Sequence, residues 1–146
     1  MVRVKVFNTH PRKKVSPARC TQYVTRVLGG EKIRNAEVSV VLVGSRRIRT
    51  LNRQYLKHDY VTDVISFTLE SGENLEGEIY VNLDRATHQA KTFGVTPAHE
   101  AARLVVHGAL HLTGYDDATA RQKEKMAKRE DVYLRYWFRH SEERGL

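Results

Sequence analysis

Histidine, glycine and aspartate stand at metal-binding intervals in the stretch HGALHLTGYDD, residues 107–117. His107 and His111 are four residues apart, so on a helix both imidazoles project from the same face and can bind one ion. Gly114 can adopt a positive φ, which ends the helix and reverses the chain. Asp117 can then return toward the histidines and offer a carboxylate oxygen. Three protein ligands leave one position open for water, which is the arrangement of catalytic zinc sites.

The same spacing occurs in the metzincin proteases, in which a glutamate follows the first histidine and acts as the general base. Here Gly108 occupies that position, and without a base peptide hydrolysis loses about 10²–10⁴-fold in rate. Phosphodiester cleavage depends more on the ion, which activates water and stabilises charge on phosphate oxygens. The alternative to a metal site is that His107 and His111 are packed core residues and Gly114 is only a helix cap.

The charge of the chain favours a polyanionic partner. Lysine and arginine number 25 against 17 acidic residues, which gives a formal net charge of +8. Such an excess suits nucleic acid, because phosphates release counterions when basic side chains approach. A basic surface that only keeps the protein soluble is the alternative.

A single cysteine, Cys20, excludes an intramolecular disulfide and fits a reducing compartment, most simply the cytoplasm. The start of the chain has no charged segment followed by an apolar run, and the apolar stretch at 38–44 is too short for a membrane span. We therefore expect a soluble protein with no membrane partner.

Hydrophobic patterning predicts a single domain over residues 1–146. Strands are expected at 2–8, 38–44, 61–69 and 77–84, and helices at 17–30, 46–56, 85–93, 97–113 and 118–138. The short polar connection between the last two strands indicates an antiparallel hairpin. The predicted fold class is α+β: a mixed four-stranded sheet with right-handed crossovers and an antiparallel edge strand, packed by about five helices.

Residue types also predict how these helices begin and which side chains they bury. The expected N-terminal caps are Ser16, Ser45, Asp84 and Thr96. In the last helix, the residues expected to face the core are Met126, Val132, Leu134 and Trp137.

Three ordered segments resemble the YbeY family of bacterial rRNA-maturation endoribonucleases. LNRQYLKHDYVTDVISF, residues 51–67, resembles the family's first signature, GEIYVNLD at 77–84 its second strand, and HGALHLTGYDD its metal motif. Met126 and Glu130 match the start of its last helix. The resemblance covers almost the whole chain and implies a zinc-dependent enzyme that cleaves RNA.

Carried over to this sequence, the resemblance makes His107 and His111 zinc ligands, with Asp117 where the family usually has a third histidine. One zinc ion per chain is expected. A carboxylate also admits manganese or nickel, because it changes the charge and the donor atoms of the site. Asp116 is expected to be exposed or to support a ligand.

A second departure is Leu56, where many relatives have an arginine thought to engage RNA. Basic residues on or just after the preceding helix are the candidates for RNA binding: Arg46, Arg47, Arg49, Arg53 and Lys57. The alternative is a solvated helix face.

Several other polar residues have a weaker assignment. Glu100 lies seven residues before His107 on the same helix face and can accept a hydrogen bond from a ligand or form an ordinary helix ion pair. His58 lies within the first signature and can reach the site. A surface role is expected for His10, His88, His99 and His140.

The sequence thus predicts a metal-dependent endoribonuclease in which His107, His111 and Asp117 hold the ion that activates water. The resemblance adds rRNA, the small ribosomal subunit and its quality control as substrate and partner. Two rivals stay open. A metallopeptidase of metzincin type requires another carboxylate near the metal, and a non-catalytic ribosome assembly factor with a structural metal requires a fourth protein ligand.

Overall fold

The protein is built on a four-stranded sheet, seen in a computed structural model that describes residues 1–57 and 61–144, with side chains up to residue 138. The strand order is β1-β2-β4-β3. The strands are β1 (Val2–Asn8), β2 (Asn35–Val43), β3 (Val64–Glu70) and β4 (Asn74–Asn82). β1, β2 and β4 are parallel, whereas β3 pairs antiparallel to β4 at one edge. The α+β class and the antiparallel edge strand are confirmed.

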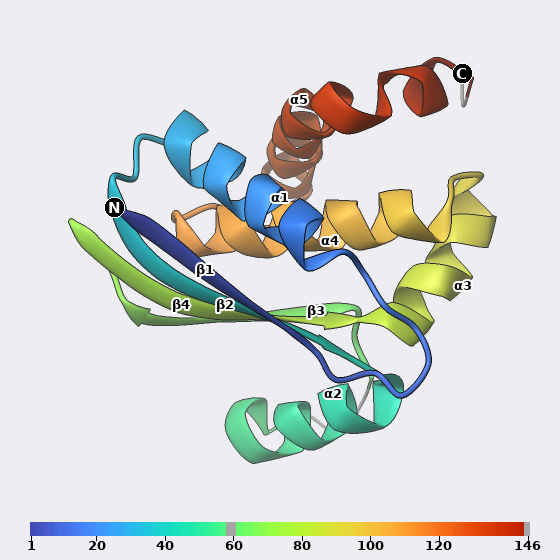
Figure 1. Ribbon diagram of the computed structural model, residues 1–146, viewed down its shortest axis with the longest axis horizontal. Coiled ribbons are helices and arrows are strands. Elements are labelled where there is room, and N and C mark those ends of the chain that lie inside the picture. The colour runs from blue at the N-terminus through green and yellow to red at the C-terminus, as the bar shows by residue number, and fades with distance from the viewer. Residues whose placement is uncertain (58–60, 145–146) are drawn as a thin grey trace.

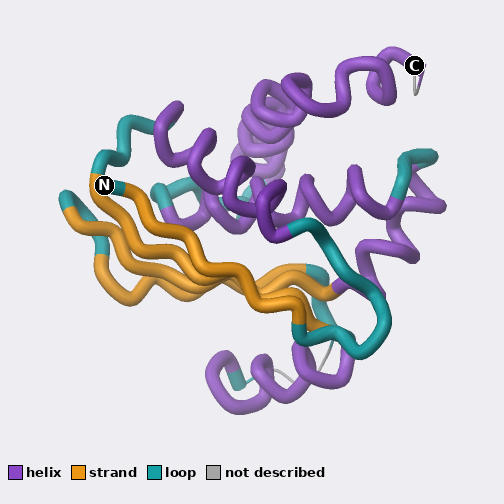
Figure 2. Tube along the Cα trace, in the orientation of Figure 1, coloured by secondary structure: helices purple, strands orange, loops and turns teal. Residues whose placement is uncertain are grey.

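Helices cover both faces of the sheet unequally (Figure 1). The helical segments are α1 (Pro17–Gly30), α2 (Ser45–Leu51), the π-helix η1 (Asn52–Leu56), α3 (Leu83–Phe93), α4 (Pro97–Leu112) and α5 (Ala120–Arg144). α1, α3, α4 and α5 lie on one side of the sheet and α2 on the other, as the tube trace also shows (Figure 2). None of the helices within the described residues is long and apolar enough to cross a bilayer.

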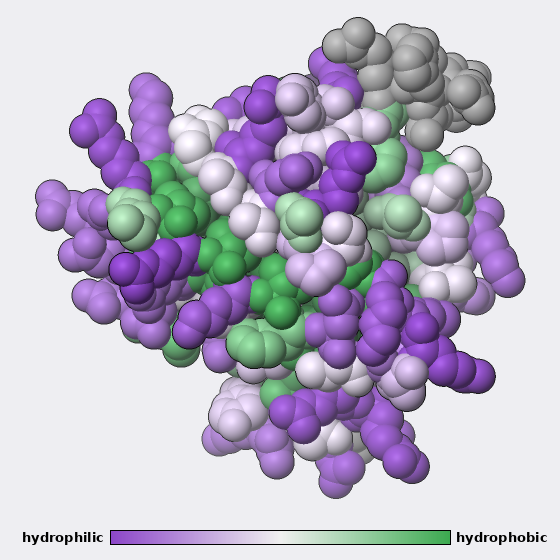
Figure 3. Space-filling model, in the orientation of Figure 1, coloured by the Kyte–Doolittle hydropathy of each residue, from purple (hydrophilic) through white to green (hydrophobic). Residues whose placement is uncertain are grey.

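Two apolar clusters hold these layers together. The larger lies between the sheet and the four helices, and its fully buried side chains include Leu28, Leu42, Ile79 and Leu110. The smaller lies between α2 and the other face of the sheet, and its buried residues are Val43, Ile48, Leu51 and Ile65. β2 contributes to both clusters, because its second half, Val40–Val43, carries apolar side chains on both faces, whereas β1 alternates along its whole length and leaves one face exposed. Hydrophilic side chains cover the outer side of the α2 layer (Figure 3).

Two predicted helix caps are wrong, and one residue explains both. α2 begins at Ser45 with Gly44 as its cap, and α3 begins at Leu83 with Asn82 as its cap. The Asn82 side chain accepts hydrogen bonds from two backbone N–H groups of the first turn. Asp84 instead turns its carboxylate toward α2 and accepts the Ser45 N–H at 3.0 Å. The acceptor expected within α3 therefore serves the start of another helix.

Burial in the last helix follows the prediction at three of four positions. Met126 and Leu134 are buried and Trp137 packs against the core, but Val132 is 48% exposed. Helical geometry is interrupted at Phe138 (φ −126°, ψ 26°), the residue at which the sequence predicted the helix to end. The predicted caps Ser16 and Thr96 are confirmed, since each side chain accepts a first-turn N–H.

Candidate metal centre

Helix α4 carries the two histidines of the motif on a partly exposed strip formed by Arg103, His107 and His111. Eleven of its residues are buried, which fixes the helix against the sheet and against α1 and α3. His107 and His111 remain partly open, with side chains 20% and 26% exposed. Their ring centroids are 4.8 Å apart. The i, i+4 spacing therefore yields two neighbouring imidazoles on one accessible face, as the sequence predicted.

The turn after α4 brings the aspartate back to these rings. Gly114 has φ +110°, and the Tyr115 N–H reaches back to the Leu110 carbonyl at 3.1 Å, which is the hydrogen bond of a Schellman turn. The Asp117 carboxylate then lies 3.2 Å from Nε2 of His107 and 3.4 Å from Nε2 of His111. Donor atoms of the three side chains lie within 4.8 Å of one another. Asp116 is exposed.

A buried glutamate orients the first histidine. Nδ1 of His107 donates to Glu130 on α5 at 2.6 Å, which leaves Nε2 free to face Asp117. Burial lowers the pKa of His107, but the hydrogen bond and the negative charge of Glu130 outweigh it and raise the pKa overall. The second oxygen of Glu130 accepts from Arg103 at 2.9 Å. A carboxylate behind a metal-binding histidine sets its tautomer and strengthens it as a ligand.

Sequence reasoning assigned no role to Glu130 and offered Glu100 as a possible partner of His107. The structure differs, because Glu100 is buried and accepts a hydrogen bond from Gln89 at 2.8 Å. Burial raises the pKa of Glu100. Glu130 lies 23 residues beyond His107 on another helix, so no local spacing could have indicated this pair.

A second glutamate holds the turn that carries Asp117. Glu31, just after α1, accepts hydrogen bonds from the hydroxyl groups of Tyr115 and Tyr133 and from Arg129. The Tyr115 contact measures 2.9 Å and spans 84 positions of sequence. Burial would raise the pKa of Glu31, but these donors lower it overall. Glu31 thus ties the metal-site turn to α1 and α5.

Close packing of α4 on the sheet explains the glycine at position 108. A Cβ atom at Gly108 would lie 2.5 Å from Cγ2 of Ile79 and 3.1 Å from the Ser66 hydroxyl. Cβ atoms in proteins essentially never approach that closely, so any side chain at position 108 would force Ile79 to shift. The contact is reciprocal, because a Cβ at Gly77 would meet Leu112 at 2.6 Å. The glutamate that the proteases carry at this position would therefore disturb the packing of α4 on β4.

The three side chains open into a cavity of about 420 Å³ beside the edge strand β3. Its other lining residues come from η1, from the approach to β3 and from β3 itself: Asn52, Leu56, Thr62, Asp63, Val64, Ile65, Ser66 and Thr68. Two imidazole nitrogens and a carboxylate oxygen are donors that suit zinc and similar divalent ions. The donor set and its open side fit a metal ion with space for a substrate.

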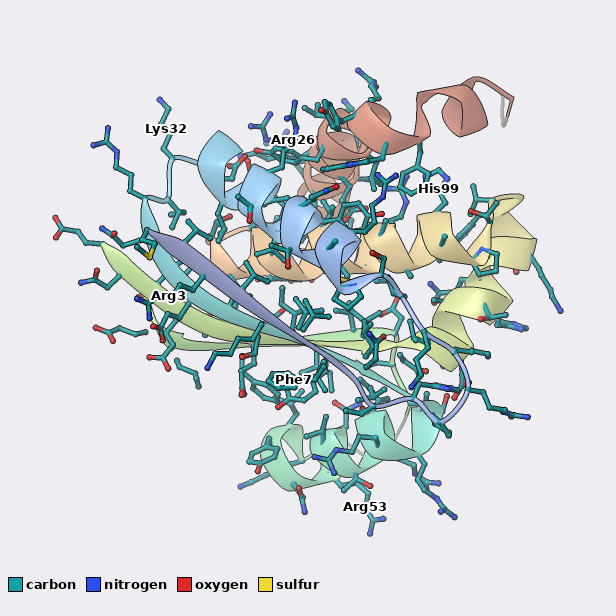
Figure 4. All side chains as sticks on the ribbon, viewed as in Figure 1. Arg3, Phe7, Arg26, Lys32, Arg53 and His99 are labelled. Atoms are coloured by element: carbon teal, nitrogen blue, oxygen red, sulfur yellow. The ribbon has the colours of Figure 1, made fainter. Side chains whose placement is uncertain are left out.

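The predicted RNA-binding residues lie apart from this cavity. Arg46 and Arg47 border a different cavity, of about 680 Å³, together with Arg12. Arg49, Arg53 and Lys57 are exposed, and Figure 4 shows Arg53 projecting from the side of the helix turned away from the sheet. None of these five lines the metal cavity, whereas Leu56 does.

The surface role expected for the remaining histidines is confirmed only for His88, which is exposed. His10 is buried, and its Nδ1 accepts two backbone N–H groups while Nε2 donates to Asp84 at 2.8 Å. His99 is buried and stacks on Phe138 with ring centroids 4.4 Å apart; Figure 4 shows it on the side of α4 that faces α5. Residue 58 and the side chain of residue 140 lie outside the described residues.

Comparison with known proteins agrees with this architecture. A family model described as "Endoribonuclease YbeY" matches residues 5–137. Endoribonuclease YbeY of Chlorobium luteolum is 40% identical over 138 residues, covering 94% of this chain and all of the relative. The Salinibacter ruber protein of that name is 39% identical over 140 residues, covering 90% of this chain and 89% of the relative. The solution structure of TM1509 from Thermotoga maritima superimposes with a TM-score of 0.62 at 25% identity, covering 99% of this chain and 93% of that one. Together with the His107, His111 and Asp117 group, these matches show that the chain belongs to the Endoribonuclease YbeY family.

Proposed function

We propose that this protein is a metal-dependent endoribonuclease that hydrolyses RNA phosphodiester bonds in rRNA maturation and small-subunit ribosome quality control. The observation that carries the proposal is the convergence of His107, His111 and Asp117 at an open cavity. Family membership supports RNA as the substrate class. We place the reaction in the cytoplasm, where rRNA is processed, with the small subunit as partner.

The chain's own residues prepare this site for one zinc ion. Glu130 holds His107 with Nε2 outward, and the turn at Gly114 delivers the Asp117 carboxylate. A divalent ion held by His107, His111 and Asp117 would supply Lewis-acid chemistry, lowering the pKa of water and offsetting charge on the phosphate. Asp117 in place of histidine adds a negative charge, so manganese and nickel are the alternatives to zinc.

Electrostatics support an RNA substrate. The net charge of +8 attracts phosphates over long range. Arg46, Arg47, Arg49, Arg53 and Lys57 are exposed on α2 and η1 or at their end. We assign them to contacts with the RNA backbone beyond the cavity, because none of them lines it.

The packing at Gly108 weighs against a peptidase of metzincin type, since a general base at that position would have to displace Ile79. The carboxylate that such a peptidase requires near the metal has one candidate in the cavity lining, Asp63. A structural metal is also disfavoured. Within the described residues the metal-binding group has three members and borders a cavity, whereas closed structural zinc sites use four protein ligands.

Metal content and cleavage of rRNA by purified protein test the proposal together. His111→Ala and Asp117→Ala are expected to lose both the metal and the cleavage. Asp116→Ala is the matched control, because Asp116 is an exposed aspartate next to the proposed ligand, and it should retain both. Wild-type metal content in Asp117→Ala would remove Asp117 from the ligand set, and undiminished cleavage in His111→Ala would refute the metal-dependent mechanism.

A further inference from the structure

A second cavity, of about 680 Å³, lies at the carboxyl ends of β1 and β2. The two strands are parallel neighbours, yet the chain leaves β1 toward α1 on one side of the sheet and leaves β2 toward α2 on the other (Figure 1). Connections that diverge in this way open a crevice beyond the strand ends, where open sheets with parallel strands bind their ligands. The cavity also has the size of a small-molecule site. It shares no lining residue with the metal cavity, so the fold provides a separate place for a ligand.

Three arginines line this cavity and make it an arginine crevice. Arg12 belongs to the segment between β1 and α1, whereas Arg46 and Arg47 lie in the first turn of α2. All three are exposed, and among the residues that the structure describes no carboxylate forms an ion pair with them. Guanidinium groups at one cavity repel one another, and a bound anion relieves that repulsion. Their paired N–H donors match the oxygens of a phosphate group.

The carboxylate in the lining of the crevice does not cancel this charge. One oxygen of Asp84 accepts hydrogen bonds from Nε2 of His10 at 2.8 Å and from Lys13 at 3.0 Å. The other oxygen accepts the Ser45 N–H at 3.0 Å. Lys13 therefore offsets the negative charge of Asp84, and the three arginines leave the crevice with an excess of positive charge.

We infer that the arginine crevice binds the phosphate groups of a nucleotide, either free in solution or within an RNA chain. The arginines donate to the phosphate oxygens, and Pro11 and Val41 add apolar lining for the rest of the ligand. This is a binding site beyond the proposed hydrolysis, since none of its residues lines the metal cavity. If the ligand is RNA, the crevice is where Arg46 and Arg47 make the backbone contacts assigned to them above.

Two titrations test the crevice, one with N-methylanthraniloyl-ATP followed by fluorescence and one with a labelled RNA of about twelve nucleotides followed by anisotropy. Both are carried out in EDTA, so that neither phosphate bound to a metal ion nor RNA cleavage contributes. The double variant Arg46→Ala/Arg47→Ala and the single variant Arg12→Ala should each weaken binding of at least one probe by at least about tenfold, the effect of losing a charge-assisted hydrogen bond to phosphate. Inorganic triphosphate should displace that probe from the wild-type protein.

A loss confined to the ATP derivative would assign the crevice to free nucleotides, and a loss confined to the RNA would assign it to the RNA chain. The matched control for the double variant is Arg34→Ala/Lys91→Ala, which removes two exposed cations just before β2 and on α3 and should have no effect. Circular dichroism melts establish that each variant is folded.

Unchanged affinity for both probes in the crevice variants would overturn the inference. Equal weakening in the control would also overturn it, because it would show general attraction of anions to a basic protein. The outcome is separable from the proposed function, since binding in EDTA requires neither the metal ion nor cleavage. A wild-type protein that cleaves no RNA would refute the endoribonuclease and leave the crevice standing.

Discussion

Gly108 and Ile79 touch where α4 crosses β4, so closely that a Cβ atom at position 108 would lie 2.5 Å from the isoleucine side chain. On the same turn of α4, the Gly108 carbonyl accepts a hydrogen bond from the Ser66 hydroxyl of β3 at 3.1 Å. These two contacts hold the neighbouring His107 beside β3. Gly108, which stands where the proteases have their general base, is thus also the residue that lets the helix carrying His107 and His111 lie on the sheet.

Gly108→Ala should destabilise the fold by about 1–3 kcal/mol, the usual range for overpacking a tight core. Urea unfolding measures the loss. Gly29→Ala is the control, since a Cβ there meets nothing within 4 Å and stability should change little. Because the clash is with Cγ2 of Ile79, which alanine lacks, Gly108→Ala combined with Ile79→Ala should cost less than the sum of the two single substitutions, and strict additivity would contradict a direct contact.

Glu130→Gln should weaken metal binding roughly 10- to 100-fold, the range for loss of a carboxylate behind a metal-binding histidine. The amide carries no charge and cannot satisfy both His107 and Arg103, which Glu130 now contacts. Competition with a chromophoric chelator measures the affinity. Glu124→Gln, at an exposed glutamate of the same helix, should bind metal as wild type does, and an equal affinity in both variants would refute this role.

Glu31→Gln should loosen the turn that carries Asp117. The Glu31 side chain is 13% exposed and accepts from two tyrosines and an arginine, so we expect a loss of about 2 kcal/mol in stability. Metal affinity should fall as well, because Tyr115 is anchored only two positions before Asp117. Tyr115→Phe removes a single donor and should give a smaller change in the same direction. Unfolding and metal titration together check this, and a stability loss with unchanged metal affinity would separate Glu31 from the site.

Asp84→Asn should reduce stability at neutral pH and change its dependence on acid. Partial burial raises the pKa of Asp84, but the hydrogen bonds from His10, Ser45 and Lys13 lower it more. The carboxylate therefore stabilises the fold above the unfolded value of about 3.9, and this contribution is lost as pH falls through the lower folded pKa.

Because the Asp84 side chain is 41% exposed, its contribution is about 1 kcal/mol after allowance for solvent screening. Urea unfolding of wild type and Asp84→Asn at a series of pH values measures the gap between them. The gap should begin to close below about pH 4, and a gap that stays constant down to pH 2 would contradict the assignment.

The sequence determined the features that depend on neighbouring residues. The i, i+4 histidines, the reversal at Gly114 and the caps at Ser16 and Thr96 follow from helix geometry and residue type alone, and the structure contains each of them. Such signals depend only on residues close in the sequence, so they do not require knowledge of the tertiary structure.

Only the tertiary structure decided which distant groups complete the site. Glu130 forms a hydrogen bond with His107, 23 positions away in the sequence, and Glu31 with Tyr115, 84 positions away. Neither pair follows from the periodicity of a helix or strand. The sequence indicated only that Gly108 lacks the side chain of a general base, whereas the structure shows that a small residue is needed there to pack against Ile79. The sequence predicted Asp84 to be a helix cap, whereas in the structure its carboxylate accepts the Ser45 N–H. Sheet order and helix packing set these contacts, because they decide which residues far apart in the chain share one buried space.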